Sequence, residues 1–274
     1  MITPPTSTTW RAIAGEATIA SSHLALGATS LSDANLGLFQ NYGQAFFALS
    51  VGIERSCKLA VVTSQYIKSG GTLPTSGATR SSGHRLNRLI DDLRAVANDN
   101  GVPWTLPIVP EPIHDGIISV LTDFANNITR YYNLDLLTTG ARSSLDAIGS
   151  WHMNVTIPVM RKHYTLRRHM ADHTYAENYA NILGRFSIFN FQNEVGNWLQ
   201  DPYQVAMHLR QSDFARPLER MYVLRIAGQI YSVMRVLGNE AAKRNLPDVP
   251  LLGEFFAIFG NDDAYFRTRK TWKI

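Results

Sequence analysis

Two residues in the second half of the chain have the types and the spacing that metal-free cleavage of RNA requires. Arg168 and His173 are five positions apart, and Arg167 offers a longer spacing and a further contact to RNA. A histidine with a pKa near neutrality can exchange a proton with the reacting oxygens, while an arginine can hold the phosphate with two hydrogen bonds. On a helix the pair lies about 140° apart, which suits a groove between two copies of the chain. The alternative is a basic helical face that is exposed to solvent.

The same stretch contains histidines that could serve as metal ligands. His169 and His173 are one helical turn apart and could hold one ion from the same face, with His163 and Asp172 nearby. The residue after His169 is Met170, where an HExxH motif has its glutamate. Because scattered histidines are common on basic helices, we predict no metal site and no cofactor.

A second group of candidate binding residues lies at 130–135. This run contains a guanidinium, two phenols, an amide and a carboxylate. Arg130 and Asn133 are one turn apart and could both face a nucleotide or RNA, with Tyr132 as a stacking surface. A structural interpretation stays open, in which the tyrosine rings fill the core and Arg130 interacts with a helix C-terminus.

Long helices must position these residues. Apolar side chains recur at three- and four-residue steps in a segment that begins at Ser32 and Asp33 and ends near residue 68. They are Leu38, Tyr42, Phe46, Leu49, Ile53, Cys57 and Val61. Further helices are expected at about 83–98, 114–132, 145–171, 173–200 and 214–245, and Pro158 should kink or break one of them. The alternation typical of strands is largely absent, so we predict an all-α protein.

The first two of these helices resemble a HEPN domain. The resemblance rests on residues 46–58, in which Glu54 and Lys58 lie one turn apart, and on the Gly83-His84-Arg85-Leu86 start of the next helix. It covers roughly residues 32–140. HEPN domains are compact helical bundles that often dimerise, and many are metal-independent ribonucleases of toxin, antiphage or RNA-processing systems.

The resemblance implies two alternative functions. In the first, Arg168 and His173 match the Arg-x(4–6)-His motif of active members, and the chain is a metal-independent endoribonuclease of a toxin or antiphage system. In the second, it is a non-catalytic module that dimerises and binds a nucleotide, an RNA or a partner protein. The resemblance also implies a homodimer and a cognate antitoxin or defence partner.

Glu54, Lys58 and His84 are predicted to form a structural polar cluster. A glutamate in the middle of an apolar helix is costly to bury if it stays charged and unpaired. Lys58 one turn on, Arg55 beside it, or His84 across the helix interface must therefore pair with it. We expect the cluster to fix how the two helices cross.

The composition sets the remaining limits. Of 274 residues, 45% are hydrophobic and 18% are charged, which allows a packed core. A net charge of +4 permits a polyanionic partner without requiring one. Cys57 is the only cysteine, so no disulfide can form within the chain and a cytoplasmic location is expected. No apolar run is long enough for a membrane span, so no membrane contact is expected.

The C-terminal end should pack on the rest of the chain. Phe255, Phe256, Ile258 and Phe259 form an apolar cluster that a lone exposed helix would not tolerate. We expect residues 251–259 to dock on the bundle, and the contact to continue through Tyr265, Phe266 and Trp272. The predicted organisation is an N-terminal segment, a HEPN-like bundle, a second helical region and a docking tail, at 1–31, 32–140, 141–250 and 251–274.

Overall fold

The structure, a computed structural model, describes residues 7–35, 38–75, 83–106, 112–131, 134, 137–138, 146–184 and 189–273. Within these residues the protein is all-α except for one short hairpin, which confirms the predicted fold class. The long helices are α1 (Thr8–Asp33), α2 (Gln40–Lys68), α4 (Leu86–Asp99), α5 (Pro112–Ala125), α9 (Leu166–Leu183) and α10 (Pro202–Lys243). The shorter elements are α7 (Ala147–Trp151), the π-helix η1 (His152–Thr156), α8 (Ile157–His163), strands β1 (Phe191–Gln192) and β2 (Trp198–Leu199), α11 (Leu252–Phe255), the 3-10 helix η2 (Ala257–Phe259) and α12 (Asp263–Thr268).

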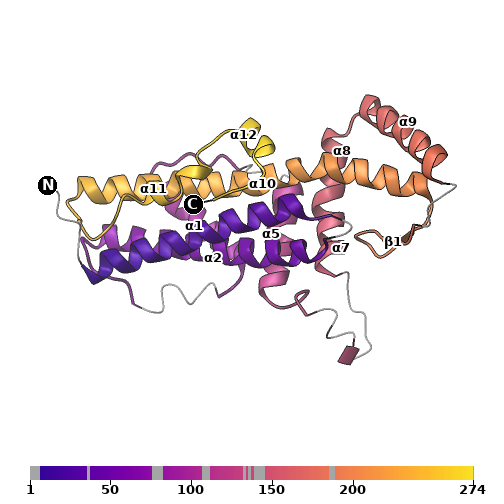
Figure 1. Cartoon of the computed structure of the whole chain (residues 1–274). Helices are drawn as coiled ribbons and strands as arrows, with labels where there is room; N and C mark the ends of the chain where they lie inside the picture. Colours follow the sequence, from indigo (N-terminus) through magenta and orange to yellow (C-terminus); the bar gives the residue numbers. More distant parts are fainter. Residues whose placement is uncertain are drawn as a thin grey trace.

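Helices α1 and α2 form a closely packed pair (Figure 1). A Cβ atom at Gly27 of α1 would lie 2.5 Å from Cγ of Leu49, and one at Gly52 of α2 would lie 2.8 Å from the backbone nitrogen of Leu24. Real Cβ atoms do not approach their neighbours so closely. The two glycines therefore let each helix seat a leucine of the other against its backbone.

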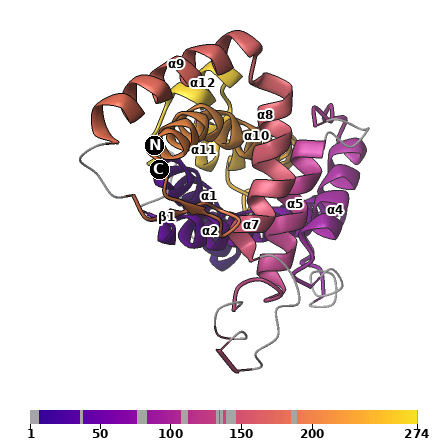
Figure 2. The same cartoon turned by 90° about the vertical axis from the view of Figure 1, so that its right-hand side faces the viewer.

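Helix α10, which is 42 residues long, packs on this pair, and α4 and α5 pack beside α2 (Figure 1 and Figure 2). One hydrophobic core joins them and includes Phe46 of α2, Trp151 of α7 and Tyr222 of α10. Residues on both sides of position 140 therefore share one core. Cys57 is buried in it, and burial raises the pKa of its thiol. None of the described helices combines the length and the apolar character that crossing a membrane requires.

The N-terminal part of the chain differs from the prediction. Ser32 and Asp33, expected to start the first helix, lie at the C-terminal end of α1, and α2 begins at Gln40. Most of the segment 1–31 is therefore helical. Its buried positions are filled mainly by small residues such as Ala17 and Ala28. Because these are weak hydrophobic signals, the helical periodicity of α1 is hard to detect in the sequence.

The prediction of one helix at 173–200 was also wrong. Helix α9 ends at Leu183, and β1 pairs with β2 in an antiparallel hairpin. The side-chain Oδ1 of Asn193 accepts hydrogen bonds from the turn, and Gly196 has a φ of 83°. Asp201 then caps α10, which begins twelve residues before the predicted start at 214 and continues through Pro217.

Pro158 does not break the helix that contains it. Elements α7, η1 and α8 are continuous, and the break comes between α8 and α9, inside the helix predicted at 145–171. In a regular α-helix Trp151 and Thr156 would lie about 140° apart. The π-turn brings both to one side, where Trp151 Nε1 and Thr156 Oγ1 donate to the carboxylate of Glu219 at 3.2 and 2.5 Å. Burial raises the pKa of Glu219.

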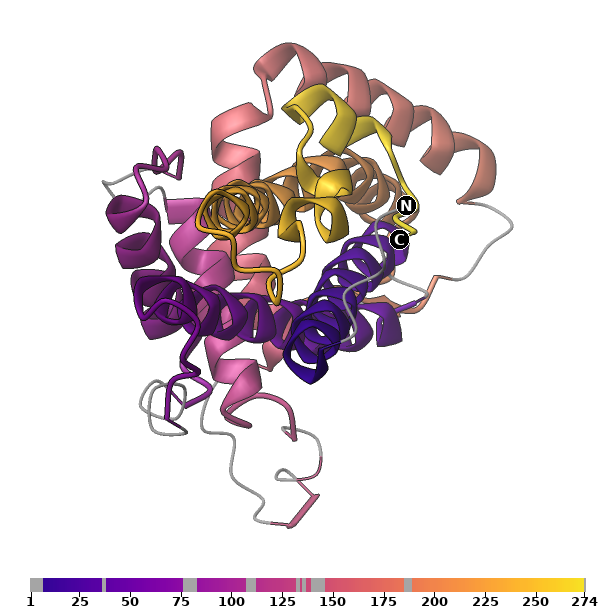
Figure 3. The same ribbon diagram turned by 90° about the vertical axis from the view of Figure 1, so that its left-hand side faces the viewer.

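The C-terminal tail packs on the bundle, where Figure 3 shows it against α10. Phe256, Phe259, Phe266 and Trp272 are buried in the main core. Arg220, itself buried, donates to the backbone carbonyls of Phe266 and Arg267 and to the hydroxyl of Ser32. One guanidinium thus ties the tail to both α10 and α1.

Candidate nucleic-acid interface

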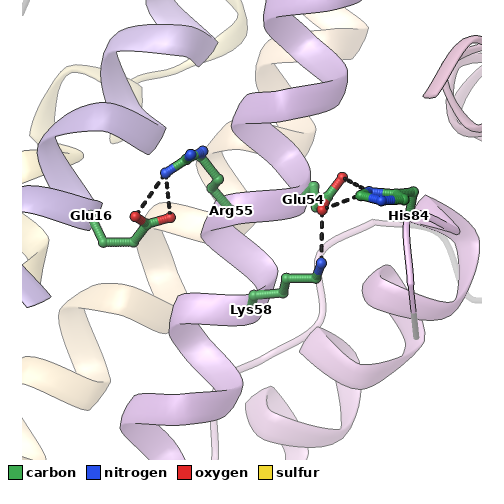
Figure 4. A network of polar contacts seen from close by, with 5 residues as sticks. All are labelled: Glu16, Glu54, Arg55, Lys58 and His84. Atoms are coloured by element: carbon green, nitrogen blue, oxygen red, sulfur yellow. Dashed lines mark hydrogen bonds and ion pairs between the residues drawn. The ribbon is translucent and has the colours of Figure 1, made fainter. Parts of the chain in front are cut away.

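Glu54 makes the contacts expected of a structural polar cluster (Figure 4). Its Oε1 lies 2.7 Å from Lys58 Nζ, and His84 Nδ1 lies 3.0 Å from both carboxylate oxygens. Burial alone would raise the pKa of Glu54, but the hydrogen bonds from Lys58 and His84 outweigh it and lower the pKa. On another side of α2, Arg55 instead pairs with Glu16 of α1.

Replacing Glu54 with alanine should lower the free energy of unfolding by about 1–3 kcal/mol, because Lys58 and His84 lose their shared partner. Glu16→Ala is the matched control. Both partners of its ion pair with Arg55 are more than one third exposed, so this loss should cost about 1 kcal/mol or less. Urea unfolding followed by circular dichroism measures both variants. Equal losses, or a Glu54→Ala variant that unfolds like the wild type, would contradict a structural role for the cluster.

The predicted catalytic residues lie on α9, whose N-terminal part belongs to a basic segment. Residues 161–173 contain four Arg or Lys and three His, with a single acidic residue, Asp172. Arg161, Lys162 and Arg167 are exposed. Helix α9 lies at the edge of the molecule, alongside the N-terminal half of α10 (Figure 1 and Figure 2). This segment therefore carries exposed positive charge at the edge of the molecule.

Asp172 is the anchor of α9 on α10. Its side chain is 0% exposed, and its two oxygens accept from Arg168 Nε and Arg210 Nε, each at 2.9 Å. The hydroxyl of Tyr164 donates to it as well, at 2.9 Å. Burial would raise the pKa of Asp172, but the hydrogen bonds from Arg168, Tyr164 and Arg210 lower it. Arg168 also lies over the ring of Phe214.

His173 has different partners. Its Nδ1 lies 2.9 Å from the hydroxyl of Tyr203, and its Nε2 lies 3.6 Å from a carboxylate oxygen of Glu177. Arg168 and His173 thus face separate sets of side chains, and the structure does not bring them together within one chain. His173 is stacked with His169 at 6.5 Å between ring centroids. No group of three or more His, Cys, Asp or Glu that could hold a metal ion is found among the described residues.

The second predicted group is only partly described. Tyr132 and Asn133 lie outside the described residues. The guanidinium of Arg130 lies over the rings of Phe47 and Phe124, at 4.8 and 5.3 Å from their centroids. Arg130 therefore packs against α2 and α5, whereas Tyr131 is exposed and does not fill the core as the structural interpretation of this run expected.

A row of aromatic rings on α9 and the hairpin was not predicted. Tyr175 and Tyr179 are stacked at 6.3 Å, Tyr179 lies 6.1 Å from Phe189, and Phe189 lies 6.5 Å from Phe191. Tyr175 and Phe191 at its two ends are exposed, as is Trp198 on the neighbouring strand. The four-residue spacing of the tyrosines was visible in the sequence. Its continuation was not, because the segment 173–200 was expected to be one helix.

The hairpin, which carries Phe191 at the end of this row, is fixed to α10. Glu194, buried in its turn, lies 2.9 Å from His208 Nε2. Burial would raise the pKa of Glu194, but the interaction with His208 lowers it. At the other end of the row the guanidinium of Arg210 lies 5.0 Å from the ring centroid of Tyr175. The rings therefore sit on two elements that are both held by α10.

The fold and this surface define an all-α protein in which an aromatic row with exposed ends follows a basic segment. Comparison with known protein families, with curated proteins and with solved structures finds no match for the chain.

Proposed function

We propose that the chain is a HEPN-like helical module that binds single-stranded RNA on the surface formed by α9 and the hairpin. The row Tyr175, Tyr179, Phe189 and Phe191 carries this proposal. Proteins that hold single strands stack bases on aromatic rings and follow the backbone with cations. The two exposed ends of the row, Tyr175 and Phe191, offer ring surface to bases.

The charges on the segment that precedes the row support an RNA ligand. Arg161, Lys162 and Arg167 are exposed along α8 and α9, and the one acidic residue among 161–173, Asp172, is buried between two arginines. A strand stacked on the rings would continue along these cations. Each phosphate contact releases counterions, so the affinity should fall as salt is raised.

Tyr175→Ala should weaken the binding of a fluorescent single-stranded RNA by about 1–3 kcal/mol, measured by anisotropy at fixed salt. Phe191→Ala should act similarly, and Arg167→Gln should reduce the salt dependence by about one phosphate contact. Tyr131→Ala is the matched control, because Tyr131 is 47% exposed against 48% for Tyr175 and precedes the alternative binding residues Tyr132 and Asn133. A loss with Tyr131→Ala alone would place the RNA at that group, and unchanged affinity in both tyrosine variants would overturn the proposal.

The second candidate is a metal-independent endoribonuclease of a toxin or antiphage system. Its support is the exposed His173, held by the Tyr203 hydroxyl next to the basic segment. The test is incubation with total RNA in the presence of EDTA. Cleavage that is lost in His173→Ala and kept in His169→Ala would support the enzyme. RNA binding without cleavage would instead support the non-catalytic binding module.

The proposal includes a homodimer and a cognate antitoxin or defence partner in the cytoplasm. A dimer would supply a second Arg168 and His173, which lie apart within one chain. Light scattering of the full-length protein measures its mass in solution, and a monomer in the presence and absence of RNA would remove the dimer from the proposal.

A further inference from the structure

One face of α1 is exposed from its first turn to its last. Six of the exposed residues follow one another at alternating steps of four and three positions. They form the α1 seam, which consists of Thr8, Ala12, Gly15, Ile19, Ser22 and Leu26. The next position at this spacing, Thr29, contacts Trp272 of the tail, so the open seam ends at Leu26. A helix that packs along one partner helix presents its contact residues at this spacing.

The seam is uncharged, and two of its residues are large and apolar. Ile19 and Leu26 are 43% and 53% exposed. Phe47 of α2, which is also exposed, lies edge-on to the ring of His23 beside the seam. The charged residues among the 26 of α1 are Arg11, Glu16 and Asp33. Since a helix with so few charges is normally covered on all sides, the seam indicates a contact with another molecule.

Gly15 of the seam has no role in the packing of the single chain. It lies inside the helix, where glycine is destabilising relative to alanine. Gly27, on another side of α1, is needed because Leu49 lies against it, but a Cβ at Gly15 would meet nothing within 4 Å. The backbone at Gly15 can therefore be approached closely from outside, and Ser22, two turns later, is small as well. Both positions leave room for a large side chain of a second helix.

The order of small and large residues fits a second α1 that runs in the opposite direction. With Gly15 opposite Leu26 of the second copy, Ile19 lies opposite Ser22 of the second copy, because each pair of positions adds up to 41. Every large side chain then meets a small one, which fills a helix contact without gaps. A parallel pair in register would instead place Ile19 against Ile19 and Gly15 against Gly15.

The charges at the two ends of α1 favour the same direction. Arg11 and Asp33 are both exposed. In the antiparallel register Thr8 lies opposite Asp33 of the second copy, and Arg11 is one turn from Thr8, so each Arg11 approaches an Asp33 of the other copy. A parallel pair would bring Arg11 to Arg11 and Asp33 to Asp33. Opposed helix dipoles also favour the antiparallel pair.

We infer that the α1 seam binds a second copy of this chain, with the two α1 helices antiparallel. Helix α9 lies toward the C-terminal end of α1 (Figure 1). A two-fold axis across the middle of the seam therefore places the two α9 surfaces at opposite ends of the dimer. Each surface stays open to its own stretch of RNA, and Arg168 of one copy is not brought to His173 of the other. This dimer thus accords with the non-catalytic candidate.

The inference gives an interface to the homodimer of the proposed function, but it does not rest on RNA binding, because the seam contains no residue of α9. Light scattering of the full-length protein at about 100 µM should give the mass of a dimer. Ile19→Glu should raise the dissociation constant at least about a hundredfold, because it places two carboxylates without a cation in the contact. The variant should keep the helical circular dichroism of the wild type, since Ile19 is exposed in the single chain.

Ile182→Glu on α9 is the matched control, because it introduces the same charge at an exposed isoleucine outside the seam. It should leave the mass and the dissociation constant unchanged. A monomeric wild type, or a dimer that survives Ile19→Glu, would overturn the inference.

Oxidative cross-linking tests the direction of the two helices. The natural Cys57 is buried, so introduced cysteines can be followed alone. In the antiparallel register positions 15 and 26 of different copies face each other, whereas the two positions 15 lie about 16 Å apart along the helices, beyond the reach of a disulfide. A mixture of Gly15→Cys and Leu26→Cys proteins should therefore form cross-linked dimers, and neither variant should do so by itself.

Cross-linking of Gly15→Cys by itself, or none in the mixture, would contradict the antiparallel pair. A cross-linked dimer that binds no RNA would support the interface and overturn the proposed function.

Discussion

Removing residues 251–274 should leave a chain that aggregates or melts far below the full-length protein. The tail carries the buried rings of Phe256, Phe259, Phe266 and Trp272. Truncating one large buried aromatic side chain costs about 3–5 kcal/mol, and a domain is stable by about 5–15 kcal/mol in total. The deletion removes four such rings and uncovers the apolar surface of α10. It also leaves the buried guanidinium of Arg220 without the tail carbonyls that accept its hydrogen bonds.

Thermal melting followed by circular dichroism, together with size-exclusion chromatography, measures this effect. Removal of residues 273–274 alone is the control, since it leaves Trp272 and its backbone bond to the Thr29 hydroxyl in place. A protein without 251–274 that stayed monomeric with an unchanged melting temperature would show that the tail is dispensable for the fold.

Asp172→Ala should destabilise the contact between α9 and α10 by about 3–5 kcal/mol. The substitution leaves Arg168 and Arg210 without the carboxylate that they share, and it removes the acceptor of the Tyr164 hydroxyl. Hydrogen exchange of α9 and urea unfolding measure the loss. Glu177→Ala removes an exposed carboxylate from the same helix and should change the stability by less than about 0.5 kcal/mol. If α9 exchanged equally slowly in both variants, Asp172 would not be its anchor.

The pH dependence of this contact has a definite sign. The pKa of Asp172 is lower in the folded protein than its usual 3.8, so the unfolded chain takes up a proton first as the pH falls. The stabilisation is therefore complete above about pH 4 and is lost as the pH falls through the lower pKa of the folded state. The Asp172→Ala variant should lack this part of the acid transition.

Helices with large buried apolar residues were predictable from the sequence, whereas a helix with small buried residues was not. Helix α2 was found because Phe46, Leu49 and Ile53 recur at helical spacing. Helix α1 was missed because alanine and serine fill many of its buried positions. Small side chains pack well only where a partner helix comes close, and that approach depends on the glycines of both helices.

Apart from the contact between Glu54 and His84, which the resemblance indicated, polar contacts were predictable when their partners are close in sequence. Glu54 and Lys58 are four residues apart, and so are Arg168 and Asp172. The second arginine on Asp172, Arg210, comes from 38 positions further along, and no sequence spacing indicates it. The contacts of Arg220 were out of reach for the same reason, because their carbonyl acceptors lie in the tail, 46 and 47 positions further along.

The π-turn η1 also determines which changes of chain length this region tolerates. It contains one residue more than a regular α-helical turn. The side chains of α8 therefore point in the directions that they would have if the helix were uninterrupted and one residue shorter. Deleting one residue from 152–156 would close η1 into an α-turn and keep His163 directed at Tyr222. Deleting one from 157–162 would rotate His163 by about 100° and bring Tyr164 to its place. In an alignment, a single-residue gap at η1 is therefore neutral for the direction of α8, and the same gap one turn later is not.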